Sequence, residues 1–374
     1  MPVLLKEILP LDLLEKHLAD GVVRRQTHPR YFELAIYNYT EKAQFDRIWD
    51  DVTNVCRGLI VAHGEVVVAR GFNKFHNLNT EYAPETMEDN LHGLPLVTAK
   101  LDGSLGILYN WDGQWWIATR GSFDSEQARW ATKWLRQHSA WLESQELGRY
   151  TPVFEIIYGA NRIVVDYDYE ALVLLALINN RTGLEVPRDL LDEFGETCQF
   201  PVVKRFDKTL AECAAEDNLN EEGYVLTYPN GVKVKVKFAE YVRLHRILTG
   251  LNPKGIWELL ANGTCTMVDL ILADQKMPVG FRTWLSGWVN QLRAQFSAIE
   301  SRAAEVFSQR PVGDGPESTT REDKPWRKAQ ALYFQKTPDL CPVLFAMLDG
   351  KDYVPVIWGK IKPRGDDTFK KDGE

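Results

Sequence analysis

The sequence predicts an α+β protein, with antiparallel sheets flanked by helices over the first two thirds and helices over the last third. Short apolar or alternating segments recur between about residues 31 and 238. Asp112-Gly113 and Asn230-Gly231 each separate two such segments, as the turns of β-hairpins do. From Val279 onward, apolar residues recur at helical spacing instead.

The elements of the first two thirds follow in chain order. A short amphipathic helix is expected over about 9–19, and a helical turn near Trp49. Longer helices are expected over 125–147, 187–194 and 210–218, and the tryptophan-rich stripe of the first is typical of a core face. Strands are expected over 31–40, 57–62, 65–70, the segment ending near Lys100, 106–109, 115–118, 153–158, 159–165, 171–178, 221–228 and 232–238.

Composition limits the class of protein. A 374-residue chain with 45% hydrophobic and 26% charged residues is typical of a globular protein with two or three domains. We find no apolar run of membrane-spanning length and no signal-peptide pattern, so we expect a cytoplasmic protein with no membrane partner. Five cysteines without a CxxC or Cys/His cluster indicate free thiols and no structural zinc. A net charge of -8 means that any polyanion must meet a local basic patch.

The stretch Thr98-Ala-Lys-Leu-Asp-Gly-Ser-Leu-Gly106 is the centre of the functional interpretation. It predicts a strand, a tight turn and a second strand, with Lys100 at the turn, where its amine can face a cleft. A solvated lysine before a turn gives the same pattern. The motif alone therefore leaves both interpretations open.

A later strand alternates lysine and valine. In Val232-Lys-Val-Lys-Val-Lys-Phe238, the side chains of Lys233, Lys235 and Lys237 lie on one face. Ammonium groups about 6.6 Å apart repel one another unless an anion lies beside them. The segment predicts either an exposed sheet face or a phosphate-binding floor. A lysine nucleophile among such cations has a lowered pKa and is more reactive at neutral pH.

Other segments contain polar residues in apolar surroundings. Arg57 stands at the start of an apolar strand. It is either a surface charge at the strand end or a residue whose planar guanidinium projects into a cleft and binds phosphate. Glu155 interrupts an apolar strand and needs a partner or a metal, because an unpaired buried carboxylate is costly. The segment 71–79 mixes aromatics with lysine and amides, which suits either a packed loop or contact with a nucleotide.

The order of these motifs resembles the covalent nucleotidyltransferases, which comprise DNA ligases, RNA ligases and mRNA capping enzymes. It is most similar to the ATP-dependent phage RNA ligase 1 family, over roughly residues 30–245. The segments that carry the resemblance are Asn38-Tyr-Thr40, Cys56-Arg-Gly58, Asn73-Lys-Phe-His-Asn77, Lys100-Leu-Asp-Gly-Ser104, Arg120-Gly-Ser122, Phe154-Glu155 with Ala160-Asn-Arg-Ile163, Glu222-Gly-Tyr224, and Val234-Lys-Val-Lys-Phe238 continuing to Tyr241 and His245.

The resemblance implies that Lys100 attacks the α-phosphate of ATP and becomes lysyl-AMP, with Lys235 and Lys237 as further catalytic residues. AMP then passes to the 5′-phosphate of an RNA end, and a 3′-hydroxyl displaces it. Glu155 and Glu222 are the implied ligands of Mg²⁺ or Mn²⁺. The implied nucleotide-binding residues are Arg57, Lys74, His76, Thr98, Ala99, Leu101, Asp102, Gly103, Arg120, Glu155, Glu222 and Gly223.

The partner implied is RNA, either a single strand or a broken loop such as that of a tRNA. We expect a monomer that acts in RNA repair or tRNA processing. Two positions depart from the family pattern: His76 replaces an aromatic residue, so adenine stacking there is in doubt, and Arg120 replaces a lysine.

The resemblance also implies two domains. A nucleotidyltransferase domain with an N-terminal extension is expected over 1–247, and a helical C-terminal domain over 248–374, with a disordered tail from about 365. DNA ligases and capping enzymes have a small β-barrel in place of the helices. The alternatives left open are another covalent nucleotidyltransferase, a protein that transfers AMP elsewhere, and an RNA-binding module without ligation.

Overall fold

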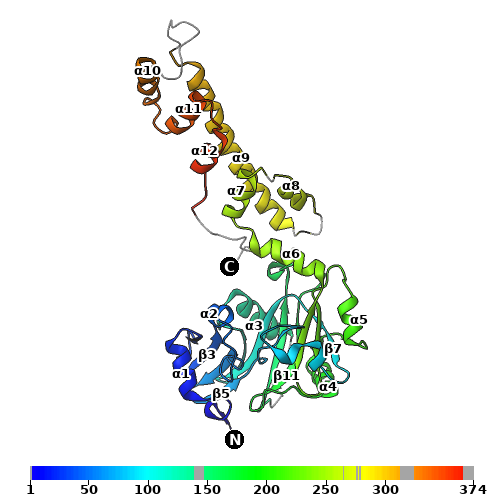
Figure 1. The fold of residues 1–374 in the computed structure, drawn as a ribbon. Coiled ribbons are helices and arrows are strands. Elements are labelled where there is room, and N and C mark those ends of the chain that lie inside the picture. The colour runs from blue at the N-terminus through cyan, green and yellow to red at the C-terminus, as the bar shows by residue number, and fades with distance from the viewer. Residues whose placement is uncertain are drawn as a thin grey trace. The chain divides into compact units, whose positions relative to one another are not determined.

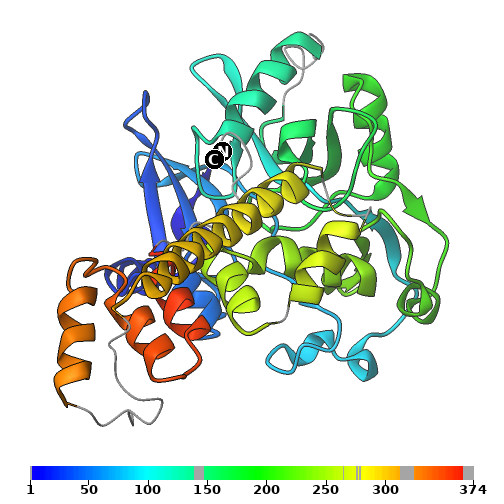
Figure 2. The ribbon, with the colours of Figure 1, turned by 90° about the horizontal axis from the view of Figure 1, so that it is seen from above.

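A computed structural model describes residues 2–138, 147–263, 265–274, 277, 279–311 and 324–364. The chain divides between His245 and Arg246 into two compact units, and Figures 1 and 2 show the ribbon from two directions. Within the described ranges, each helix is too short or too polar to cross a lipid bilayer. The end of the predicted helix over 125–147 and the tail from about 365 lie partly or wholly outside these ranges.

The first sheet lies at the N-terminal end of the chain. Helix α1 (Leu11–Ala19) packs on one of its faces, where Leu14 joins Tyr37 and Leu59 in a hydrophobic core. Helix α2 (Glu41–Phe45) follows strand β3. In spatial order the strands are β1 (Val3–Leu4), β5 (Val66–Ala69), β4 (Arg57–Ala62), β3 (Leu34–Tyr39) and β2 (Val23–Thr27).

The second sheet shares a core with the first, which contains Ile60 and Ile107. Its other core includes Ala131 of α3 (Glu126–His138) and Leu191 of α4 (Arg188–Cys198). The predicted hairpin is confirmed, because Asp112 and Gly113 have φ of 53° and 69°, as a tight hairpin turn requires. In spatial order the strands are β11 (Ala171–Asn179), β10 (Tyr150–Ile157), β8 (Ser104–Trp111) and β9 (Gln114–Thr119).

The third sheet places the two lysine motifs side by side. Its register aligns Lys100 with Gly223, and Gly223 with Lys237. Helix α5 (Leu210–Ala215) precedes its central strand. In spatial order the strands are β12 (Arg205–Phe206), β7 (Leu96–Lys100), β13 (Gly223–Thr227), β14 (Lys233–Lys237) and β6 (His76–Asn77). All the strand pairs are antiparallel except β14 with β6, which is parallel.

The strand predicted over 159–165 is wrong. Gly159–Asn161 is a 3₁₀ turn instead. The Asn161 side chain donates to the carbonyl of Ile156, and the backbone N–H groups of Val164 and Val165 donate to the Asp102 carboxylate. These donors are therefore used by side-chain and turn contacts, and the segment forms no ladder.

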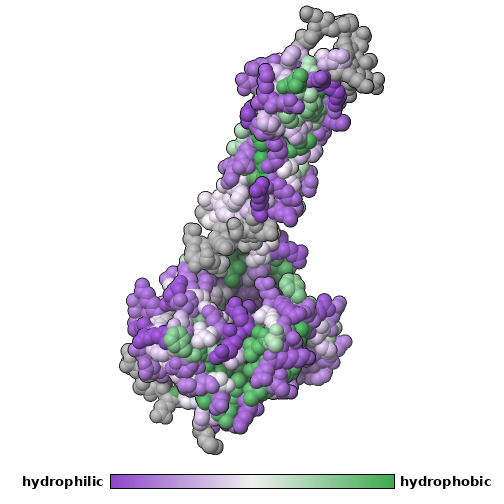
Figure 3. Space-filling model, turned by 90° about the vertical axis from the view of Figure 1, so that its left-hand side faces the viewer, coloured by the Kyte–Doolittle hydropathy of each residue, from purple (hydrophilic) through white to green (hydrophobic). Residues whose placement is uncertain are grey.

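The described elements after α6 (Ala239–Gly250) are helices, which agrees with the helical spacing of apolar residues from Val279 onward. Phe334, Leu344 and Ile357 belong to one hydrophobic cluster of this unit. On the face shown in Figure 3, hydrophilic residues predominate and hydrophobic ones form small patches. The helices are α7 (Pro253–Ala261), α8 (Cys265–Ala273), α9 (Val279–Ser308), α10 (Lys324–Phe334), α11 (Cys341–Leu348) and α12 (Val354–Lys360).

The alignment of the lysine strands depends on Gly223. Its φ is +143°, and a Cβ there would lie 2.0 Å from the carbonyl oxygen of Val236. Gly223→Ala should lower the free energy of unfolding by about 3 kcal/mol or more, measured by urea denaturation. Gly159→Ala is the control, because its Cβ would meet Glu170 only at 3.8 Å. Equal stability of the two variants would contradict this role of Gly223.

Candidate active site

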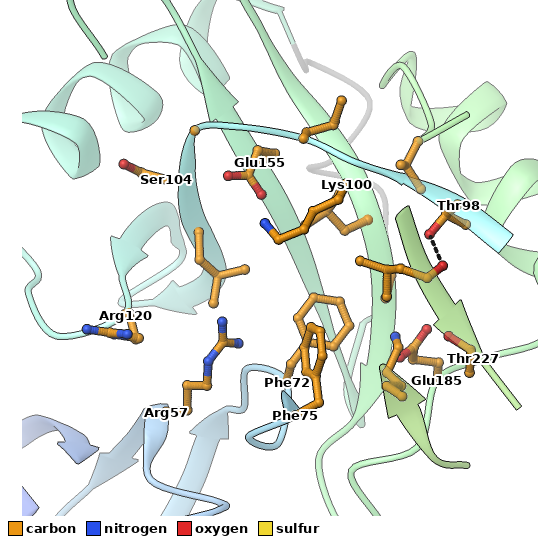
Figure 4. A pocket seen from close by; sticks show the side chains of 18 of the residues that line it. Arg57, Phe72, Phe75, Thr98, Lys100, Ser104, Arg120, Glu155, Glu185 and Thr227 are labelled. Carbon is orange, nitrogen blue, oxygen red and sulfur yellow. Dashed lines mark hydrogen bonds and ion pairs between the residues drawn. The ribbon is translucent and has the colours of Figure 1, made fainter. Parts of the chain in front are cut away.

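A cavity of about 580 Å³ is lined by residues from all three sheets (Figure 4). Arg57 comes from the first sheet, Glu155 from the second and Lys100 from the third. The amine of Lys100 and the carboxyl of Glu155 point toward each other in Figure 4, and Arg57 extends toward them. Residues far apart in the sequence are thus brought around one space.

The carboxylate of Glu222 joins the two lysine motifs. Its Oε2 lies 2.7 Å from the amine of Lys100, and its Oε1 lies 2.8 Å from the amine of Lys237. Only 4% of the Glu222 side chain is exposed, so the two ion pairs are little screened by water. Gly223, which lacks a side chain, lies between the two lysines in the sheet.

The three lysines of β14 share one face, as predicted, and alternate with buried Val234 and Val236. Lys233 pairs with Glu185 and Lys237 with Glu222. Between them, Lys235 makes no ion pair with the described residues, and its amine lies 4.8 Å from the ring centroid of Phe75.

The repulsion between these cations is therefore least balanced at Lys235, because its two neighbours on the strand each have a paired carboxylate. Burial lowers the pKa of its amine, the neighbouring cations Arg57, Lys74, Lys100 and Lys237 lower it further, and it reaches about 6. An anion at this position would relieve that repulsion. This geometry favours the phosphate-binding floor over the exposed sheet face.

Glu155 approaches Lys100 because Gly103 has no side chain. A Cβ at Gly103 would lie 2.5 Å from the carbonyl oxygen of Ile156 and 3.2 Å from Oε1 of Glu155. Burial raises the pKa of Glu155 to about 8, although Lys100 opposes the shift. With this pKa, the carboxyl of Glu155 is largely protonated near neutral pH.

Asp102 holds the turn after Lys100 in place. Its Oδ1 accepts a hydrogen bond of 2.8 Å from the hydroxyl of Tyr241. Its Oδ2 accepts from the backbone N–H groups of Val164 and Val165 at 2.7 and 2.9 Å. Because both oxygens are engaged and the residue is buried, Asp102 positions the Lys100 turn and does not line the cavity.

Two cations, Lys74 and Arg120, lie against the ring of Tyr39. Arg120 donates a 3.2 Å hydrogen bond to the Tyr39 hydroxyl, and the amine of Lys74 lies 5.3 Å from the ring centroid. Burial favours a raised pKa for Tyr39, but Arg120, Lys74 and Arg57 together lower it. Tyr39 therefore links the cations at this side of the cavity, a role that its motif in the sequence did not indicate.

His76 lies outside the cavity lining. Its buried ring packs 5.3 Å from the centroid of Trp49 and 5.4 Å from that of Tyr82. Burial, with Lys74 and Lys235 nearby, lowers the pKa of His76 to about 4, so the ring is neutral. The aromatic residues that face the cavity are Phe72 and Phe75 (Figure 4).

The structure thus separates the predicted site residues into two groups. Those that line the cavity are Arg57, Thr98, Ala99, Lys100, Leu101, Gly103, Arg120 and Glu155. Those outside its lining are Lys74, His76, Asp102, Glu222, Gly223, Lys235 and Lys237. Glu222 and Lys237 still reach the first group through their ion pairs with each other and with Lys100. Sequence reasoning missed the lining residues Arg24, Phe72, Phe75 and Glu185 as site residues.

The carboxylates of the site suit a metal ion that is coordinated partly by the protein and partly by the phosphates of a bound molecule. Among the described residues, no group of three or more His, Cys, Asp or Glu is placed to hold an ion. Glu155 offers hard oxygen atoms at the cavity, whereas both oxygens of Glu222 are ion-paired. Mg²⁺ commonly binds through one or two carboxylates together with water and ligand phosphates, and Glu155 fits that arrangement.

Comparison with known proteins agrees with the motif order. A family model described as RNA ligase matches residues 55–241, half of the chain. The chain belongs to this RNA ligase family. The resemblance inferred from the motifs is thereby confirmed.

Two curated relatives are each 31% identical to the chain. One is a putative bifunctional polynucleotide kinase/RNA ligase of Autographa californica nuclear polyhedrosis virus, aligned over 66% of this chain and 40% of that protein. The other is a putative RNA ligase of Thermovibrio ammonificans, aligned over 50% and 51%. The chain therefore spans about half the length of these relatives, or less. A solved RNA ligase of Naegleria gruberi with PPi is 19% identical, covers 43% of this chain and 54% of its own, and has a TM-score of 0.35.

The lowered pKa of Lys235 predicts proton uptake when the cavity binds a phosphate. Above pH 6 the amine is mostly neutral, and an anion beside it raises its pKa, so binding adds a proton. Affinity for inorganic pyrophosphate should therefore strengthen from about pH 8 to about pH 6 and then level off. Calorimetry in two buffers of different ionisation enthalpy measures the uptake. Lys235→Arg, which stays protonated, should lower the uptake, and equal uptake by both proteins would exclude Lys235 as a source.

Proposed function

We propose that the protein is an ATP-dependent RNA ligase that joins 5′-phosphate and 3′-hydroxyl ends. The observation that carries the proposal is the amine of Lys100, which faces a cavity beside a row of cations in a chain of the RNA ligase family. Phosphoryl transfer requires in-line positioning and charge neutralisation, and the cations that line the cavity, such as Arg57 and Arg120, support the second.

In the first step, the Lys100 ammonium releases one proton to solvent, and the resulting neutral amine attacks the α-phosphorus of ATP. The nitrogen–phosphorus bond forms, the α–β phosphoanhydride bond breaks, and pyrophosphate leaves. Glu222 Oε2, 2.7 Å from the amine, is placed to accept the proton that nitrogen loses. Lys235 and Lys237 stabilise the α-phosphate, and Arg57 and Arg120 hold other phosphates or the sugar.

A divalent metal, Mg²⁺ or Mn²⁺, would neutralise charge on the phosphates when bound. Glu155 would hold it, and Glu222 could join by releasing one ammonium. Phe72 and Phe75 line the cavity, and their apolar rings would contact the adenine base. Thr98, Ala99, Leu101 and Gly103 complete the wall beside the nucleotide.

In the later steps, the 5′-phosphate of RNA takes AMP from Lys100, and a 3′-hydroxyl then displaces AMP to form the phosphodiester. We assign residues 1–247 to the nucleotidyltransferase domain and 248–374 to a helical C-terminal domain. The second assignment is supported by the described elements of the second unit, which are helices. The substrate proposed is a single-stranded or broken-loop RNA, such as a cleaved tRNA, repaired by a cytoplasmic monomer.

Incubation with ATP and Mg²⁺ should add one AMP to the intact protein, as measured by mass spectrometry. Lys100→Ala should abolish the adduct, because the other lysine of the cavity lining, Lys233, is held in an ion pair by Glu185. Lys6→Ala, an exposed lysine outside the cavity, is the matched control. An adduct that persists in Lys100→Ala would overturn the proposal.

The same assay separates the remaining alternatives. Labelling by α-labelled GTP in place of ATP would indicate a capping enzyme. An adduct without circularisation of a 5′-phosphorylated RNA would indicate that AMP is transferred elsewhere. RNA binding with no adduct at all would leave a binding module, and sealing of nicked DNA alone would indicate a DNA ligase.

Removal of either lysine of the phosphate floor should slow formation of the adduct. Lys235→Ala and Lys237→Ala should each reduce the single-turnover rate by roughly 100-fold or more, because each removes a charged donor at the transferring phosphate. Near-normal rates in both variants would contradict the assignment of the floor. Circular dichroism spectra matching wild type would show that the slower rate does not come from misfolding.

A further inference from the structure

A second depression, of about 440 Å³, lies beside helix α3 and outside the nucleotide cavity. Its lining combines aromatic and basic side chains, from the turn after β2, from β9 and from α3. We call it the α3 groove. The side chains used below are His28, Arg30, Trp116, Phe123, Lys133 and Arg136.

The α3 groove is basic although the chain is acidic. Arg129, Lys133 and Arg136 follow one another at i, i+4 and i+7, so they lie on one exposed face of α3. The opposite face buries Ala131 and Leu135 in the core. Arg129 pairs with Asp124 at 3.2 Å, but Lys133 and Arg136 make no ion pair within the described part of the chain. On a protein of net charge -8, such a stripe indicates an anionic partner.

The groove has a fixed floor. Nδ1 of buried His28 accepts hydrogen bonds from the backbone N–H groups of Arg30 and Tyr31, at 3.0 and 2.9 Å. Burial lowers the pKa of His28, which keeps this nitrogen an acceptor, and the ring packs 4.7 Å from the centroid of Phe123. The turn that carries Arg30 is therefore held in place before any ligand binds.

The cations point to phosphate contact more than to base stacking. The guanidinium of Arg136 lies 4.5 Å from the ring centroid of Trp116, so one face of that indole is already covered. An arginine held in this way keeps outward N–H groups for a phosphate.

The α3 groove adjoins the nucleotide cavity. Ser122 lines the cavity and the next residue, Phe123, lines the groove, and Gln127 and Ala128 are divided in the same way. On the other side, Arg24 of β2 lines the cavity, and His28 lies four residues, or ~13 Å of extended chain, further on. Both segments thus pass from one depression to the other.

We propose that the α3 groove binds the phosphate backbone of the RNA strand whose end reacts at Lys100. The proposal rests on the proposed function and adds a path for the substrate. The continuity with the nucleotide cavity favours the reacting RNA over an acidic protein segment, since a strand that ends at Lys100 must leave the cavity somewhere along its rim.

The test compares the full-length chain with a Lys133→Glu/Arg136→Glu variant. A fluorescent, 5′-phosphorylated single-stranded RNA is titrated without ATP, and binding is followed by anisotropy. The variant should bind at least about ten-fold more weakly, and the slope of log affinity against log salt should fall by about two, one unit for each phosphate that the groove no longer binds. Lysyl-AMP formation, which needs no RNA, should remain within about two-fold of wild type.

A Lys6→Glu/Lys16→Glu variant carries the same charge change at exposed positions outside both depressions and should bind RNA like wild type. The single variant Lys133→Glu, which leaves the contact of Arg136 with Trp116 intact, should retain the fold and bind RNA with intermediate affinity. RNA binding that is equal in all variants, or absent in wild type, would overturn the proposal that the α3 groove binds RNA. The proposal would also be wrong if polyglutamate of matched charge displaced the labelled RNA as well as unlabelled RNA does. Failure of wild type to form lysyl-AMP would instead overturn the proposed function, whatever the RNA titrations show.

Discussion

The two ion pairs of Glu222 are the interaction on which the site depends. One carboxylate, almost fully removed from water, lies between the amines of Lys100 and Lys237 at 2.7 and 2.8 Å. Removing the carboxylate would leave two nearby ammonium groups facing each other in a poorly solvated place, which is strongly destabilising. Glu222 therefore stabilises the arrangement that brings Lys100, the proposed nucleophile, and Lys237 together.

The register of the third sheet turns sequence spacing into this geometry. Lys100 ends β7, Gly223 opens β13 and Lys237 ends β14, and the three lie in one row across the sheet. The next row joins Thr98, Val225 and Lys235. A slip of one residue in either pairing would turn the lysines away from the cavity. The strict alternation of valine and lysine resists such a slip, because it would place charged side chains in the core.

The sequence was informative where a pattern is local. The alternation of β14 and the Asp112-Gly113 turn specify their structures within a few residues, and both are as predicted. It was misleading where distant groups compete for backbone donors, as at Val164 and Val165, whose N–H groups bind Asp102. The placement of His76 likewise depends on rings from other segments, which no local pattern in its own loop reveals.

The charge of the whole chain gives these local cations a second effect. With a net charge of -8, most of the surface repels a polyanion, while the cavity and the α3 groove concentrate cations that lack enough carboxylates to neutralise them. For the proposed RNA substrate, repulsion by the rest of the surface would add to the selectivity that attraction to the cavity and the α3 groove provides. Because both effects act through exposed charges, added salt weakens them together, whereas the ion pairs of buried Glu222 persist. The fold of the site and its attraction for a charged strand therefore respond differently to ionic strength.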